Sequence, residues 1–406
     1  MIGKWRRLVV VLICTAVLPG CWSQNELNDL ALVFAIGLDL TEKGEYEMSV
    51  QVVNPGNVAG ATQRGGGAGG VPYTVISATG DSPMEANLKM SLKLSRILYY
   101  GHANLVVIGE FLARKGVAHA LDALERNSEF RTTSRVVIAR GQSAKETLKV
   151  LTPIAKVSSN QIQSMLSHSQ TLWGHTVEID VWELFHDIYS TGVNSVVSGI
   201  NIVGNRADGA KQTNVQSTEP EARLVLDGLG VFKQGKLDYW IPTNGARGVL
   251  WIMNKVRQTN ITVAWQGKPE AIGYHIVRTN VSVRPHMKNG KPSIKIRVEA
   301  LGDILETLVP VNLADADQIN RIEKLIEHSI WKELTAAVRN MKERKTDVFG
   351  FGEQFERNYP KDWRKLEADW FSVHFPQLDV SVEVNAIIRT AGLRIKPFKR
   401  TVELGG

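Results

Sequence analysis

Residues 80–110, GDSPMEANLKMSLKLSRILYYGHANLVVIGE, predict a capped helix and a buried strand, the unit around which the fold is organised. Asp81 or Ser82 can cap the helix, because a side-chain oxygen at this position accepts a hydrogen bond from a free backbone N–H group. The proline that follows suits the first helical turn. Residues 102–110 then form an apolar run of strand length. Helices of this length between strands are typical of βαβ units in an α/β domain.

The apolar residues of this helix recur at helical spacing. Met84, Leu88 and Leu92 share one face, and Met90 and Leu94 widen it. Burying an aliphatic side chain of this size contributes about 1.5–3 kcal/mol. We therefore expect the Met84 face to pack against the sheet.

Alternating or continuous apolar runs predict strands, and apolar residues at helical spacing predict helices. The expected strands are residues 31–40, 46–52, 74–79, 134–140, 196–203, 229–233, 237–240, 259–264, 274–285, 293–301 and 379–389. The expected helices are residues 22–30, 110–126, 143–151, 162–169, 178–189, 244–255, 315–342 and one that begins at Pro360. The order of these elements predicts a mixed α/β protein, α+β overall.

A glycine-rich run occupies residues 54–70. A phosphate-binding loop would need a following Lys-Ser/Thr pair and a helix N-terminus. The run is followed instead by Val71-Pro72-Tyr73, which continues into an expected strand. We therefore expect residues 55–70 to form a mobile loop whose length has little effect on stability.

The N-terminus has the layout of a secretory signal peptide. Lys4, Arg6 and Arg7 precede ten apolar residues, 8–17, and Leu-Pro-Gly-Cys ends the segment at residues 18–21. Ten residues rise only about 15 Å as a helix, which is too short for a hydrocarbon core of about 30 Å. We expect this segment to direct export and not to span the membrane.

Leu-Pro-Gly-Cys also resembles the lipobox of bacterial lipoproteins, in which cleavage occurs before the cysteine. Pro19 departs from the small or β-branched residue that is more usual there. The other cysteine, Cys14, lies in the apolar segment that cleavage removes, so Cys21 would otherwise remain an unpaired exposed thiol. The resemblance implies that Cys21 becomes an N-acyl, S-diacylglycerol cysteine, as the first of 386 mature residues.

The charge and hydropathy of the chain exclude some classes of function. The formal net charge is +7, and loss of the three basic residues of the signal segment lowers it to +4. No Lys/Arg-rich run is present, so nucleic acid is not an expected partner. No run of eighteen apolar residues follows Cys21, so we expect no second membrane segment.

The sequence contains no local catalytic, metal-binding or nucleotide-binding motif that we recognise. Among nine histidines, only His168 and His175 lie close together, with no carboxylate between them. Asp315 and Asp317 are better explained by capping of the long helix. We expect no metal, no cofactor and no enzymatic activity.

Three segments leave alternatives open. The polar residues Asn25, Glu26, Asn28 and Asp29 either meet a membrane or partner, or form a solvated cap. Residues 350–352, Gly-Phe-Gly, predict a turn with an aromatic wedge, in a core or at an interface. Arg247, Gly248 and Trp251 favour packing between two domains over ligand binding.

Four stretches together resemble the Ger(x)C family, the C-subunit lipoproteins of nutrient germinant receptors of endospores. They are CWSQNELNDLALVFAIGLD at 21–39, the segment at 80–110, GLGVFKQGKLDYWIPTNGARGVLWIMNK at 228–255, and TDVFGFGEQFERNYPKDW at 346–363. The resemblance implies three domains, each a β-sheet flanked by helices. It also implies a lipid anchor on the outer face of the inner spore membrane or cell membrane, and integral-membrane A- and B-type partner subunits.

The expected domains are the signal peptide at 1–20, an N-terminal α/β domain at 21–195, a middle domain at 196–270 and a C-terminal domain with the long helix at 271–396. The first functional hypothesis is a non-catalytic receptor subunit that supports assembly and signalling in spore germination. The alternative is a solute-binding lipoprotein that captures an amino acid or a sugar. A cell-wall hydrolase is the weakest hypothesis, because no catalytic constellation is visible.

Overall fold

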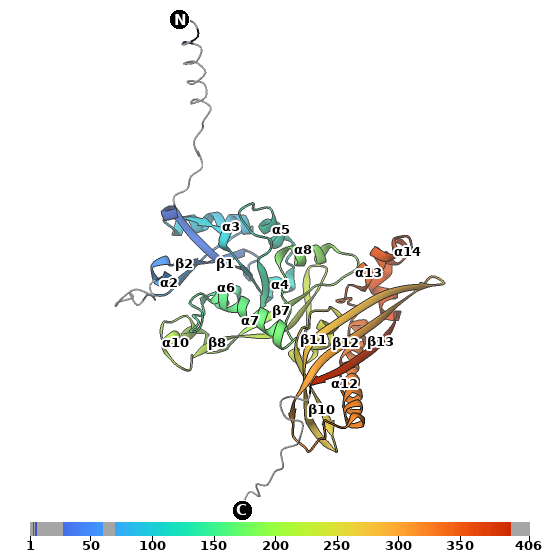
Figure 1. Cartoon of the computed structure of the whole chain (residues 1–406). Helices are drawn as coiled ribbons and strands as arrows, with labels where there is room; N and C mark the ends of the chain where they lie inside the picture. The colour runs from blue at the N-terminus through green and yellow to red at the C-terminus, as the bar shows by residue number, and fades with distance from the viewer. Residues whose placement is uncertain (1–2, 4, 6–26, 60–69, 391–406) are drawn as a thin grey trace, which may run out of the picture.

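The computed structural model describes residues 27–59 and 70–390, together with Gly3 and Trp5. Two β-sheets organise the described chain, one of nine strands and one of four, and helices flank both (Figure 1). The predicted mixed α/β class is therefore confirmed. No helix in the described ranges is both long and apolar enough to cross a membrane.

The first sheet has the strand order β3-β2-β1-β5-β6-β7-β8-β9, and β4 pairs with β1. Its strands are β1 (Leu30–Leu40), β2 (Tyr46–Val53), β3 (Tyr73–Gly80), β4 (Ile97–Tyr99), β5 (Leu105–Gly109), β6 (Arg135–Ala139), β7 (Val196–Gly204), β8 (Ala222–Lys233) and β9 (Lys236–Ile241). The central strands β1, β5, β6 and β7 are parallel, and antiparallel hairpins extend the sheet on both sides.

Two helical layers cover this sheet. The helices of the first half are α2 (Pro55–Ala59), α3 (Pro83–Met90), α4 (Glu110–Lys115), α5 (Ala118–Glu125), α6 (Ala144–Lys149), α7 (Ser158–Leu172), α8 (Val181–Tyr189), α9 (Arg206–Gly209), α10 (Thr213–Gln216) and α11 (Thr243–Ile252). Short 3-10 turns are η1 (Leu27–Asp29), η2 (Ser91–Lys93) and η3 (Tyr100–His102). In β5, Val106 and Ile108 share a core with α3, α4, α5 and α8, whereas Leu105 and Val107 face α6 and α7. The continuous apolar run of β5 thus reflects burial on both faces.

Helix α3 has the predicted cap but not the predicted buried face. The Ser82 hydroxyl accepts a hydrogen bond from the Glu85 N–H group at 3.1 Å. Ala86 and Met90 are buried, whereas Leu92 is 85 % exposed and Met84 and Leu88 are mostly exposed as well. The sequence carries two apolar stripes on opposite sides of this helix. The stripe with the small Ala86 packs inward, because alanine allows close approach to the sheet.

Three other segments differ in part from the elements expected from the sequence. The helix expected at 110–126 is divided into α4 and α5 at Gly116, whose φ of 134° is unfavourable for other residues. Within the segment expected to be a mobile loop, α2 occupies Pro55–Ala59 and residues 60–69 lie outside the described residues. Of the helix expected at 22–30, residues 27–30 are described, and they form the short turn η1 and the first residue of β1.

The second sheet has the order β10-β11-β12-β13, with β13 parallel to β12 and the other pairs antiparallel. Its strands are β10 (Thr259–Trp265), β11 (Lys268–Lys288), β12 (Lys291–Thr307) and β13 (Asp379–Thr390). Its helices are α12 (Ala316–Arg344), α13 (Phe351–Asn358), α14 (Pro360–Leu366) and α15 (Phe375–Gln377), with a short 3-10 turn η4 (Glu367–Asp369) and a short π-helix η5 (Trp370–His374). Asn289 and Gly290 close the long β11–β12 hairpin with positive φ angles of 52° and 74°.

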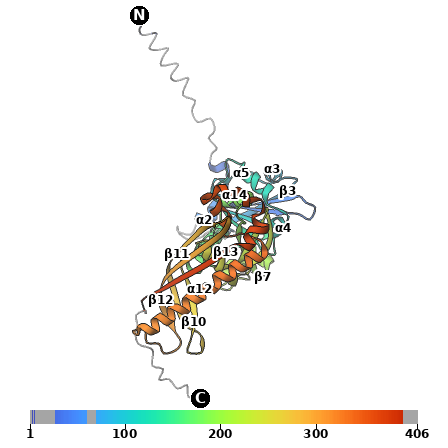
Figure 2. The same ribbon diagram turned by 90° about the vertical axis from the view of Figure 1, so that its right-hand side faces the viewer.

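Helix α12 runs along the second sheet and covers one of its faces (Figure 2). As predicted, the Asp315 carboxylate caps it by accepting a hydrogen bond from the Asp317 N–H group at 2.9 Å. Its buried side chains recur at helical spacing and are Ile322, Ile326, Ile330, Leu334, Ala337, Val338 and Met341. The opposite face of the sheet carries exposed charged side chains, so this sheet has one dry face and one wet face.

The segment assigned to a middle domain, residues 196–270, contributes β7, β8 and β9 to the first sheet and β10 to the second. Helix α11 lies within this segment and packs against β8 and α12. The fold thus joins the two sheets through residues 196–270, and the three domain boundaries proposed from the sequence stay predictions.

Candidate functional site at the junction of the two sheets

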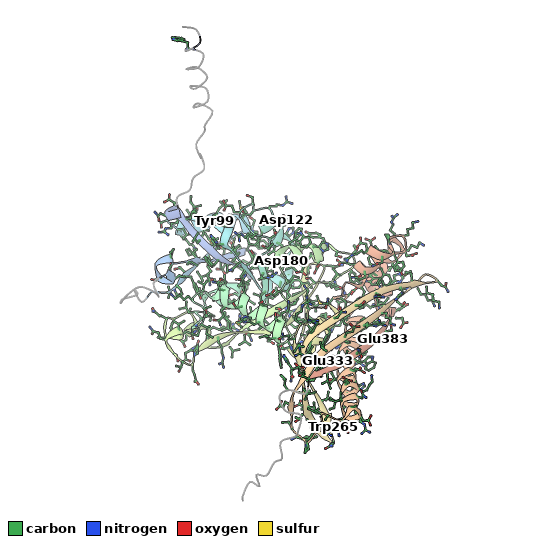
Figure 3. The ribbon with its side chains drawn as sticks, in the orientation of Figure 1. Tyr99, Asp122, Asp180, Trp265, Glu333 and Glu383 are labelled. Carbon is green, nitrogen blue, oxygen red and sulfur yellow. The ribbon has the colours of Figure 1, made fainter. Side chains whose placement is uncertain are left out.

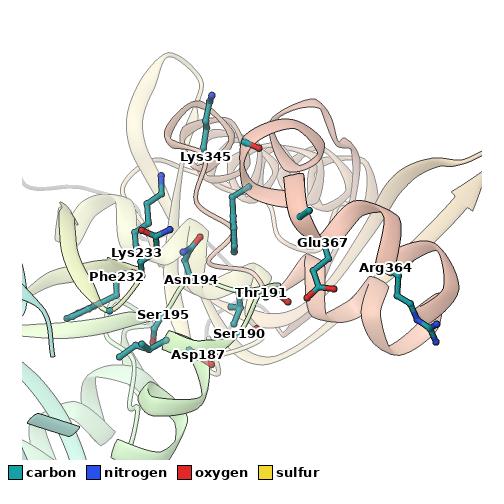
Figure 4. A pocket seen from close by; sticks show the side chains of 17 residues that line it. Asp187, Ser190, Thr191, Asn194, Ser195, Phe232, Lys233, Lys345, Arg364 and Glu367 are labelled. Atoms are coloured by element: carbon teal, nitrogen blue, oxygen red, sulfur yellow. The ribbon is translucent and has the colours of Figure 1, made fainter. Parts of the chain in front are cut away.

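A cavity of about 690 Å³ lies where the two halves of the fold meet (Figure 4). One wall comes from the chain between α8 and β7 and from the β8–β9 turn. The other comes from Lys345 and from the α14–η5 region. Its lining mixes apolar side chains with polar ones, which include Asp187, Asn194, Lys233, Arg364 and Glu367. The volume falls within the range of small-molecule sites.

Asn194 and Asp347 join the two walls by a reciprocal pair of hydrogen bonds. The Asn194 backbone N–H group donates to the Asp347 carbonyl at 2.7 Å. The Asp347 backbone N–H group donates to the Asn194 side-chain oxygen at 2.9 Å. Both residues are buried, so this pair fixes the chain before β7 against the chain before α13.

The Asp347 carboxylate organises the start of α13. It accepts hydrogen bonds from the backbone N–H groups of Phe349, Phe351 and Gly352 and from the indole N–H group of Trp370, at 2.8–3.2 Å. Burial raises the pKa of Asp347 to about 7, and the hydrogen bonds oppose that rise. This carboxylate therefore holds a turn in place and does not reach solvent.

Residues 350–352 begin helix α13 instead of forming the expected turn, and the aromatic residue belongs to the core. Gly350 has a φ of 68°, and Phe351 is fully buried beside Phe375. A Cβ atom on Gly352 would lie 2.6 Å from Gly192, so the two backbones pack directly across the junction. The glycine is required here by close approach between the two halves.

A second polar cluster lies beside the cavity. His186, Asp187 and Glu353 each place one potential metal-ligand atom within 4.8 Å of the other two. Ser190 donates a hydrogen bond to Glu353 at 3.1 Å. Burial, and to a lesser extent Glu353, raises the pKa of Asp187 to about 6. Such donors can bind a divalent cation, but the cluster is also explained as a hydrogen-bonded contact between α8 and α13.

Sequence reasoning missed this cluster, because 166 positions separate Asp187 from Glu353 and no local motif links them. His168 and His175, the two histidines that lie close together in the sequence, are not among the groups of potential metal ligands in the described residues. His175 is buried, and its Nδ1 atom contacts the Trp173 carbonyl at 2.7 Å.

The residues of α11 connect elements, as expected. Arg247 pairs with Glu333 of α12, with its Nε atom at 2.9 Å, and also donates to the Asn260 carbonyl. A Cβ atom on Gly248 would lie 2.5 Å from the Glu333 carbonyl, and Trp251 is fully buried. Arg247 therefore has structural partners on α12 and β10.

The predicted anchor region is described only at its end. Asn28 and Asp29 are exposed in η1, whereas Cys21, Asn25 and Glu26 lie outside the described residues. The lipid modification of Cys21 therefore stays a prediction from the sequence.

Two family models together cover most of the chain. The model described as spore germination protein N-terminal domain matches residues 23–202. The model described as spore germination B3/GerAC like, C-terminal, matches residues 227–392. The chain belongs to the GerAC family of spore germination proteins.

Named relatives agree with this GerAC assignment over nearly the whole chain. Spore germination protein KC of Bacillus subtilis (strain 168) is 37 % identical over 401 residues, with 98 % of each chain covered. Spore germination protein B3 of the same organism is 23 % identical and covers 91 % of this chain and 93 % of its own. The crystal structure of the GerBC protein matches with a TM-score of 0.55 at 18 % identity, over 87 % of this chain and 96 % of that chain, which supports the fold.

Proposed function

We propose that this GerAC-family protein is a lipid-anchored subunit of a nutrient germinant receptor and acts without catalysis. The observation that carries the proposal is the match of both halves of the chain to spore germination family models. The lipobox-like segment that ends at Cys21 supports anchoring. The subunit would lie on the outer face of the inner spore membrane and contact integral-membrane A- and B-type subunits.

The architecture of the junction supports a scaffolding role. The carboxylate of Asp347 and the guanidinium of Arg247 have structural partners. Two acyl chains would hold the protein at the membrane, which raises the effective concentration of weak contacts with membrane subunits. A modest protein surface can then support assembly and signalling.

The anchor is tested by Cys21→Ala in the full-length precursor. We expect an unprocessed chain that is poorly retained in the membrane fraction. Mass spectrometry of the mature N-terminus reads the result. An unmodified Cys21 in the wild-type protein, or cleavage at another position, would contradict the anchor.

The receptor role is tested by exchanging this subunit between two receptors that respond to different nutrients. We expect nutrient preference to follow the membrane subunits, and deletion of this subunit to disable the response. The fall in optical density of spore suspensions after addition of each nutrient measures the outcome. Transfer of nutrient preference with the exchanged lipoprotein would contradict the assembly proposal.

One observation favours the alternative of solute binding. The junction cavity has the volume of a ligand site and presents charged groups from both halves. Titration calorimetry of the purified protein with amino acids and sugars distinguishes the two functions. Binding that is abolished by Arg364→Ala, a variant of the cavity lining, would favour the alternative.

A further inference from the structure

An exposed apolar surface lies beside the start of the first described strand. Met84, Leu88, Leu92, Ile97 and Tyr99 form this surface, which we call the anchor-side surface, and all five side chains are exposed. They come from α3, η2 and β4, and Met84, Leu88 and Ile97 line an open groove of about 1010 Å³. A contiguous exposed apolar patch on a folded protein commonly marks an interaction site.

Basic side chains lie between the apolar residues of this surface. Lys89, Lys93 and Arg96 are exposed between its apolar residues. Lys89 pairs with Glu85 at 2.9 Å, whereas no Asp or Glu occurs in the sequence around Lys93 and Arg96, from Ala86 to Gly109. The other wall of the groove, on α5, carries charges of both signs, including the ion pair of Asp122 and Arg126. Apolar side chains mixed with Lys and Arg, with a tyrosine at the edge, suit the interface of an anionic bilayer.

The chain itself places this surface close to the predicted anchor. Leu30, the first residue of β1, pairs in register with Ile97 of β4. Leu30 lies nine positions after Cys21, a length of chain that spans at most about 30 Å when fully extended. In both ribbon views α3 and α5 lie at the end of the molecule where β1 begins (Figures 1 and 2). Tyr99 and Asp122 lie at this end, and Trp265 lies at the opposite end (Figure 3).

We propose that the anchor-side surface rests on the bilayer that holds the Cys21 lipid, with its apolar side chains in the headgroup region and its basic side chains against anionic phospholipid. This inference rests on the proposed lipid anchor. The short tether keeps the surface near the membrane, and the mix of apolar and basic groups favours lipid over a purely polar partner. The contact would fix the orientation of both sheets relative to the membrane.

The cysteine content of the chain allows a direct test. The precursor has Cys14 in the removed segment and Cys21 at the lipid site, so an added cysteine is the one thiol left for labelling. The full chain is produced as a processed lipoprotein with Leu88→Cys and placed in vesicles of phosphatidylcholine and phosphatidylglycerol at about 3:1. A bimane label on this cysteine is quenched by nitroxide lipids if it reaches the headgroup region.

Leu308→Cys is the matched control. Leu88 is 61 % exposed and Leu308 is 50 % exposed, so both labels are accessible. Leu308 lies at the far end of the molecule, because its carbonyl accepts a hydrogen bond from Lys268, the register partner of Trp265. We expect quenching at position 88 to be at least about threefold stronger than at position 308. Vesicles of phosphatidylcholine alone should reduce the difference.

Equal quenching at the two positions in a protein with an intact lipid would overturn this inference and leave the anchor in place. That result is also the one expected if the surface instead binds a membrane subunit. An unmodified Cys21, read by mass spectrometry of the same sample, would overturn both the inference and the anchor. Strong quenching at position 88 alone would support both.

Discussion

The two sheets bury their apolar side chains in different ways. Strands β5 and β6 of the first sheet are buried on both faces, between α4, α5 and α8 on one side and α6 and α7 on the other. Strand β13 of the second sheet alternates between partly buried and exposed residues, with α12 on its dry face. The first sheet is therefore sensitive to change along its whole central strands, whereas the second tolerates change at every other position.

The comparison also shows where the two halves depend on each other. The first sheet forms its core mostly with its own helices, but the dry core of the second sheet continues through α11 to Leu229 and Val231 of β8. The turn around Asp347 adds a polar link from α13 to Asn194. Changes at this link should therefore affect both sheets, and changes within one sheet should remain local.

The largest effect is expected for Asp347→Ala, which should lower the free energy of unfolding by about 3–5 kcal/mol. The substitution leaves the buried donors of Phe351, Gly352 and Trp370 without an acceptor. Urea unfolding followed by tryptophan fluorescence measures the loss. Asp347→Asn is the control, because its amide retains an acceptor oxygen and should cost less than alanine. Equal stability of Asp347→Ala and wild type would show that the link is dispensable.

A matched pair compares the two sheets directly. Ile138 of β6 is fully buried, whereas Ile387 of β13 is 48 % exposed. We expect Ile138→Ala to cost about 3 kcal/mol, since it leaves a cavity, and Ile387→Ala to cost less than about 1 kcal/mol. Thermal or urea unfolding of both variants measures the difference. Similar losses would mean that the outer face of the second sheet is covered in the native protein.

The pH dependence of stability tests the junction. Burial raises the pKa of Asp187 to about 6 from its ordinary value of 3.8. Between about pH 4 and pH 6 the folded state therefore retains a proton that the unfolded state releases. The contribution of Asp187 to stability is therefore present below about pH 4 and is lost as the pH rises to about 6. Asp187→Asn should remove this loss and gain about 1–3 kcal/mol relative to wild type between pH 4 and pH 7. A parallel pH profile for the two proteins would contradict the raised pKa of Asp187.

Local patterns in the sequence predicted much of the fold. The caps at Ser82 and Asp315 and the long helix α12 follow from short-range rules and are confirmed. The strands expected at 229–233 and 237–240 are confirmed as well, and they form the β8–β9 hairpin with positive φ angles at Gln234 and Gly235. These features depend on residues a few positions apart, so one sequence is sufficient to find them.

The sequence could not predict features that depend on distant contacts. The prediction of which face of α3 is buried was wrong, because the choice between Ala86 and Leu88 depends on the space available above the sheet. The cluster of Asp187 and Glu353 and the link from Asn194 to Asp347 bring together residues more than 150 positions apart. Their side chains carry no local signal that distinguishes them from solvated polar residues.

The smallest effect is expected on the wet face of the second sheet. Glu383 of β13 lies between Lys295 and Arg297 of β12, and these two cations hold the pKa of its carboxyl below the usual range. All three side chains are substantially exposed, so water and salt screen the attraction between them. Glu383→Gln should therefore leave the urea midpoint indistinguishable from that of wild type at physiological salt. If the variant is clearly less stable, and the loss persists at high salt, then the charges of this face are shielded from solvent. The wet face would then be an interface in the native protein, and the contrast between the two sheets would hold only for the isolated chain.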